Sequence, residues 1–70
     1  MKILAQDGMS IYESDRYAGI IGKNNHIYLS LGNNQALHIA SYENSKRVKE
    51  ILEDMFAKMD RMSKYVMPEK

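Results

Sequence analysis

The stretch "VKEILEDMFAKMDRM", residues 48–62, decides the fold of this chain. Its apolar residues recur every three or four positions, which is the spacing of a helix that buries one face. Charged residues fill the positions between them and would face the solvent. We therefore predict an amphipathic helix whose inward residues are Val48, Ile51, Leu52, Met55 and Phe56.

The boundaries of this helix follow from a cap and a proline. The side chain of Asn44 can accept from the free backbone N–H groups of a first turn, and Ser45 is the alternative cap. Pro68 disfavours helical geometry at Met67, so the helix must end before that residue. We predict a helix over about residues 44–64, followed by a short tail over residues 65–70.

The apolar stripe repeats at heptad-like spacing from Val48 to Val66. A helix of about 21 residues spans about 32 Å, whereas a short strand covers only about 17–20 Å. The far end of the stripe would then extend past the sheet. It could be core that packs on the tail "YVMPEK", a self-association surface, or a pocket for a foreign peptide or lipid. The second reading predicts a homodimer with interface residues Met55, Met59, Met62 and Val66.

The first half of the chain consists of short apolar segments separated by Gly and Asn. Turn residues of this kind between short β-type runs indicate hairpins. The expected strands are "KILAQ", "MSIYE", "RYAGIIG", "HIYLSL" and "QALHIASY". The predicted fold is a single α+β domain, with a small antiparallel β-meander of four or five strands over about residues 1–42. One long C-terminal helix would pack against it.

Alternation of side chains constrains the hairpins. Leu29 should lie opposite Leu37, which excludes a two-residue loop and favours a three-residue loop over residues 32–34. The preceding hairpin is open to two readings. A loop of Asn24 and Asn25 places Ile20 inward, whereas other registers place Ile21 inward.

The sheet face away from the helix is predicted to carry aromatic side chains and little charge. Its members would be His26, Tyr28, Ser30, His38, Ala40 and Tyr42. Tyr28 and His38 would be cross-strand partners, either as a pair that merely stabilises the sheet or as a contact surface. The possible binding face is Tyr28, His38 and Tyr42. No metal site is predicted, because the two histidines have no third ligand with a fixed place nearby.

Three basic residues gather near the start of the helix: Lys46, Arg47 and Lys49. Basic residues there oppose the helix dipole, and the ordinary reading is a solvated first turn. The alternative is a contact for an anion, such as a phosphate or an acidic side chain, because backbone N–H groups point outward at the same place.

Composition narrows the function. The chain has 70 residues, no cysteine and a net charge of +1. Disulfides and thiol chemistry are therefore excluded, and nucleic-acid binding is not expected. No apolar run approaches the roughly 20 residues of a membrane span, so we expect a cytoplasmic protein. No catalytic constellation, phosphate-binding glycine loop or cofactor motif is visible, which predicts a protein that is not an enzyme and has no cofactor.

Several stretches resemble short uncharacterised proteins of phages, prophages and mobile elements of Gram-positive bacteria. The stretches are "MKILAQDGM", "IYLSLG", "IASYENSKRVKEIL" and "YVMPEK". The resemblance implies an antiparallel sheet followed by a helix and a phage-borne origin, and it carries over no catalytic residue. We expect an accessory protein that binds another protein, such as a host defence or regulatory protein in the host cytoplasm. The alternatives are a protein that sequesters a nucleotide or another small anion, and a minor virion component.

Overall fold

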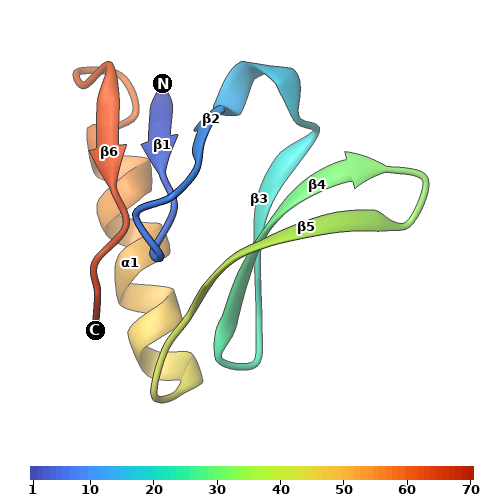
Figure 1. The fold of residues 1–70 in the computed structure, drawn as a ribbon. Coiled ribbons are helices and arrows are strands. Elements are labelled where there is room, and N and C mark those ends of the chain that lie inside the picture. The colour runs from blue at the N-terminus through green and yellow to red at the C-terminus, as the bar shows by residue number, and fades with distance from the viewer.

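The computed structural model describes residues 1–70 as two small sheets and one helix (Figure 1). The first sheet has the order β2-β1-β6 and the second has the order β3-β4-β5. The α+β class is confirmed, but the prediction of one meander is wrong, because six strands divide between two sheets. The elements are β1 (Lys2–Leu4), β2 (Ile11–Glu13), the 3-10 helix η1 (Ser14–Arg16), β3 (Gly19–Lys23), β4 (His26–Gly32), β5 (Gln35–Ser41), α1 (Ser45–Lys58) and β6 (Lys64–Val66).

Asparagine turns connect the strands of the second sheet. The loop of Asn24 and Asn25 follows Lys23, which pairs with His26, so Ile20 packs against the core and Ile21 is exposed. Asn33 and Asn34 both have positive φ, as a tight two-residue hairpin turn requires. These turns hold β4 between its two neighbours.

The register of the second hairpin is right but its predicted loop is wrong. Leu29 does pair with Leu37. Gly32 pairs with Gln35, so the loop consists of Asn33 and Asn34 only, not of three residues. Leu31 has no partner in the register and forms a bulge. Leu31 is the extra residue of this bulge, and it is exposed. A bulge changes the alternation locally, which a strict period of two does not anticipate.

A second irregularity lies in β5. Ile27 pairs with Ala40 while Tyr28 pairs with His38, so Ile39 is the extra residue. Ile39 and Ala40 are both buried. From this point the alternation is reversed. Ala40 and Tyr42 therefore turn into the core, and their predicted place on the open face is wrong.

The predicted tail is a strand. β6 pairs in parallel with β1, and β1 pairs antiparallel with β2. Tyr65 and Met67 are buried while Val66 between them is exposed, the period of two that a strand imposes. The C-terminal segment therefore completes a sheet instead of trailing from a helix.

The helix begins where the sequence predicts and ends early. Asn44 caps α1, since its side-chain oxygen accepts from the backbone N–H of Arg47 at 2.9 Å. α1 ends at Lys58 rather than near residue 64, and its 14 residues span about 21 Å. The chain must reverse after Lys58 for Tyr65 and Met67 to reach β1. The helix is therefore shorter than predicted, and residues 59–64 lead back to β1 instead of continuing it.

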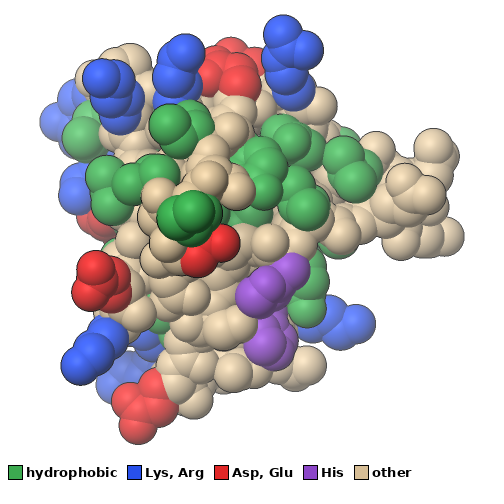
Figure 2. Space-filling model, in the orientation of Figure 1, with side chains coloured by type: hydrophobic (Ala, Val, Ile, Leu, Met, Phe, Trp, Pro, Cys, Tyr) green, Lys and Arg blue, Asp and Glu red, His purple; other side chains and the backbone are tan.

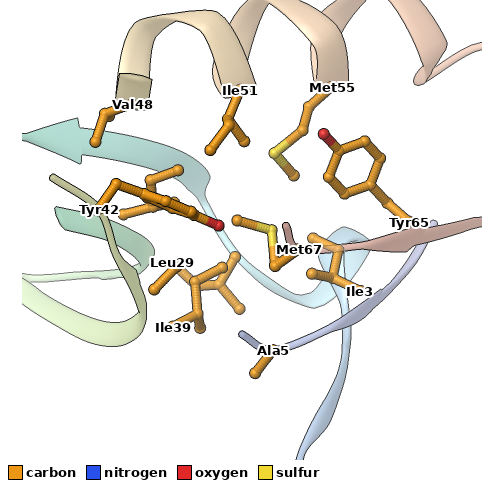
Figure 3. Close-up of a cluster of buried hydrophobic side chains, with 12 residues drawn as sticks. Ile3, Ala5, Leu29, Ile39, Tyr42, Val48, Ile51, Met55, Tyr65 and Met67 are labelled. Atoms are coloured by element: carbon orange, nitrogen blue, oxygen red, sulfur yellow. The ribbon is translucent and has the colours of Figure 1, made fainter. Parts of the chain in front are cut away.

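The core lies between α1 and the two sheets (Figure 3). Met55 from α1 and Met67 after β6 point toward each other there, with Ile3 of β1 close by. Gly22 brings β3 close to the helix, because a Cβ at this position would lie 2.7 Å from Val48 Cγ1. One cluster of 12 buried residues draws on both sheets and the helix.

Candidate functional site

The predicted interface residues do not form one continuous stripe. Met55 is only 1% exposed and belongs to the core, so it offers no surface for a partner. Met59 and Met62 are 42% and 45% exposed, but Met62 lies after the helix. Val66 is exposed on β6. The prediction of a helical heptad is therefore wrong beyond Met59. Of the four predicted interface residues, only Met59 is exposed at the end of α1.

An apolar groove of about 590 Å³ runs between α1 and the η1–β3 segment. Seven of its ten lining residues are hydrophobic. Met1, Ile20 and Leu52 are half-buried, whereas Met55 is buried. Tyr17, Phe56 and Met59 also line it. The groove thus exposes apolar side chains of α1 that the sheets leave partly uncovered.

Phe56, at the groove, differs most from its predicted burial. It was predicted to point inward, yet its side chain is 81% exposed. Val48, Ile51 and Met55 are the buried residues of α1. These three residues define the buried face of the helix. Around the helix axis, Phe56 lies roughly 110° from the centre of this face, on the side of the groove. The sequence prediction included Phe56 in the buried face, but the short sheets cover a narrower face of the helix.

The open face of the β3-β4-β5 sheet holds the second candidate site. Tyr28 and His38 are cross-strand partners, as predicted, with ring centroids 5.4 Å apart. His26 joins them, since its Nδ1 lies 3.2 Å from His38 Nε2. Figure 2 shows the two histidines side by side on the surface, next to hydrophobic side chains. This face combines aromatic area with titratable nitrogen atoms.

Ser41 completes this cluster, and sequence reasoning missed it. Its Oγ lies 2.8 Å from His26 Nδ1 and 2.8 Å from His38 Nε2. Residues 38 and 41 would lie on opposite faces of a regular strand. The bulge at Ile39 brings them to one face. Only the pairing of β5 with β4 reveals this, so the sequence held no clear signal for it.

Tyr42, the third predicted residue of the binding face, is not there. It is buried, and its hydroxyl donates to the backbone oxygen of Pro68 at 2.8 Å. Burial raises the pKa of the Tyr42 hydroxyl, and the nearby Arg47 lowers it to a smaller extent. Tyr42 therefore holds the C-terminal segment against the core instead of contacting a partner.

The predicted anion contact is engaged within the chain. The Arg47 guanidinium donates to the backbone oxygen of Lys70 at 2.9 and 3.1 Å, and it lies 3.6 Å from Glu50. Lys46 and Lys49 are exposed. The hollow beside Lys46 and Arg47 is also lined by Glu43, Glu50 and Glu69, so acidic groups share it.

The comparisons with known proteins identify no relative. No protein-family model matches this chain, and no curated protein or solved structure shows significant similarity to it. None of its helices has the length and apolar character required to cross a membrane. The groove and the histidine cluster are therefore the two surface features of this chain that bear on its function.

Proposed function

We propose that this chain is a non-catalytic binding protein that acts by protein–protein contact through the groove beside α1. The observation that carries the proposal is the 81% exposure of Phe56 at the rim of an apolar groove. Aromatic side chains dominate the energetics of protein interfaces, and contiguous apolar surface on a small protein marks a contact site. Methionine suits such a surface because its flexible side chain adapts to a partner.

A second copy of the chain is the first partner that we propose. In a two-fold dimer the same patch meets itself. Phe56 both borders the groove and projects from it, so each copy can insert its Phe56 against Leu52 and Met59 of the other. A chain this short, without disulfides, gains from such burial because its own core is small.

The resemblance to phage and prophage proteins extends the proposal to a host partner. A small phage-borne protein that binds without catalysis can block a host defence or regulatory protein by occupying its surface. Anion binding is the weaker proposal, because Arg47 is already engaged by Lys70 and Glu50. A role as a minor virion component gains no support from any feature of the surface.

Sedimentation of Phe56→Ser tests the groove. The wild-type chain is expected to sediment as a dimer at micromolar concentration, and Phe56→Ser is expected to weaken the dimer by at least about tenfold. Ile11→Ser is the matched control, since Ile11 is 69% exposed and does not line the groove. Its self-association should equal that of the wild type.

Capture from host lysate provides the second readout. Immobilised wild-type protein and Ile11→Ser should retain the same stoichiometric host protein, and Phe56→Ser should lose it. A wild-type chain that stays monomeric, and whose captured proteins do not depend on Phe56, would overturn the proposal.

A further inference from the structure

The side chains of His26, His38 and Ser41 bring two imidazole nitrogen atoms and one hydroxyl oxygen together on the open face of the β3-β4-β5 sheet. These three atoms lie 3.2, 2.8 and 2.8 Å apart. We propose that this cluster binds one divalent transition-metal ion of the Zn²⁺ class through His26 Nδ1 and His38 Nε2, with Ser41 Oγ beside them. Water would fill the remaining coordination positions, because the cluster lies at the surface (Figure 2).

The spacing of the two nitrogen atoms supports this inference. Zinc binds imidazole nitrogen at about 2.0–2.1 Å in tetrahedral geometry, which separates two such ligands by roughly 3.3 Å. The observed separation of 3.2 Å between His26 Nδ1 and His38 Nε2 is close to that value. Ser41 Oγ lies 2.8 Å from each nitrogen atom, which is shorter than this separation and is a hydrogen-bond distance.

Hydrogen bonding satisfies these three atoms in some tautomers of the two histidines but not in all of them. When both facing nitrogen atoms carry lone pairs, the single hydroxyl proton of Ser41 can satisfy only one of them. A cation accepts both lone pairs at once. Metal binding would also fix both tautomers, with the ring protons of His26 and His38 on the nitrogen atoms that face away.

The backbone holds Ser41 in place for this role. Its N–H donates to Gln6 Oε1 at 2.8 Å, and its carbonyl accepts from Gln6 Nε2 at 2.7 Å. His26 is the cross-strand neighbour of Ser41 on β4. Bulges often occur beside functional sites, where they re-aim a side chain. The bulge at Ile39 has that effect on Ser41.

The chemistry of the face selects the class of metal. Its cross-strand rows contain no carboxylate, and Lys23 lies opposite His26. Calcium and magnesium prefer oxygen ligands and would bind poorly here. Imidazole suits zinc, copper and nickel. With two imidazoles and a nearby positive charge, we expect micromolar rather than nanomolar affinity.

Titration of the full chain with Zn²⁺ tests the proposal. The chain has only two histidines and no cysteine, so NMR signals of the imidazole rings report this site alone. We expect one Zn²⁺ per chain, with both ring signals shifting together, and no comparable response to Mg²⁺. Lowering the pH from about 7.5 to about 5 should weaken binding, because protons compete for the ligands.

Variants separate this site from other binding. His38→Ala and His26→Ala should each weaken Zn²⁺ binding by more than about tenfold, since even the loss of a supporting group costs that much. Ser30→Ala, on the same sheet face, should bind like the wild type. Circular dichroism confirms that each variant is folded. Absence of Zn²⁺ binding up to millimolar concentration, or equal binding by folded His38→Ala, would overturn the proposal.

Discussion

At the scale of single residues, Gln6 connects parts of the molecule that lie far apart in the sequence. Its side chain bonds to both backbone groups of Ser41 and donates to the oxygen of Glu69 at 3.0 Å. Its own backbone N–H donates to the oxygen of Ile39 at 3.2 Å. One half-buried amide therefore joins the segment after β1, the end of β5 and the C-terminal segment.

Gln6→Ala should destabilise the protein by about 1–3 kcal/mol, because it leaves backbone groups of Ser41 and Glu69 without a partner. Chemical denaturation monitored by circular dichroism measures this change. Gln35→Ala is the control, since Gln35 is exposed at the β4–β5 hairpin, and it should have little effect. Equal stability of the two variants would mean that water replaces the Gln6 contacts without loss.

At the scale of elements, local signals predicted the start of α1 and long-range pairing set its end. The Asn44 cap depends on a contact three residues away, so the sequence displays it directly. The end at Lys58 depends on β6 pairing with β1, at the opposite end of the chain. The sequence of residues 59–64 does not indicate that pairing, because Met59 and Met62 continue the apolar spacing of a helix.

The second hairpin shows the same division. The opposition of Leu29 and Leu37 followed from alternation, but the two bulges did not. A bulge leaves its extra residue unpaired, and the bulge at Ile39 buries Ile39 together with Ala40. The histidine cluster depends on one of these bulges. The pairing of Tyr28 with His38 was therefore predictable from the sequence, whereas the addition of Ser41 was not.

The contact between β6 and α1 makes stability depend on pH. The Tyr65 hydroxyl donates to Asp54 Oδ2 at 2.8 Å, and Lys58 donates to the same carboxylate at 3.1 Å. The hydrogen bond from Tyr65 and then that from Lys58 lower the pKa of Asp54. Burial and the hydrogen bond to Asp54 raise the pKa of Tyr65.

The sign of each effect follows from linkage. The lowered pKa of Asp54 stabilises the fold above the ordinary carboxyl range near pH 4, and this contribution is lost as the pH falls through the folded-state pKa. The raised pKa of Tyr65 stabilises the fold below about pH 10, and this contribution is lost as the pH rises beyond it. Tyr65→Phe should therefore be less stable than the wild type near pH 7.

The difference between Tyr65→Phe and the wild type should shrink as the pH falls below about 4 and as it rises above about 10, because in these ranges the unfolded chain binds a proton at Asp54 or loses one at Tyr65. Thermal melts across the pH range measure this difference. Tyr12→Phe is the control, because Tyr12 packs edge-on against Tyr17 away from Asp54. A constant difference between Tyr65→Phe and the wild type at every pH would show that the hydroxyl contributes by packing alone.

At the scale of the whole molecule, two sheets of three strands share one core beneath one helix. Neither sheet encloses a core by itself, since the buried residues come from β1, β4, β5, α1 and the segment around β6. The molecule should therefore unfold as one unit. Small single domains usually behave in this way, with total stability of about 0.05–0.15 kcal/mol per residue.

Met67→Ala tests this cooperativity. Met67 is 1% exposed beyond β6, and its removal leaves a cavity that should cost about 2–5 kcal/mol, a large part of the stability of so small a domain. We expect the NMR signals of His38, on the other sheet, to broaden or disappear at the same denaturant concentration as the helical circular dichroism signal. Met9→Ala is the control, because Met9 is 84% exposed. This variant should unfold like the wild type. Loss of β6 with an intact β3-β4-β5 sheet would instead show that the second sheet holds its structure independently, and that the histidine cluster can persist without the rest of the core.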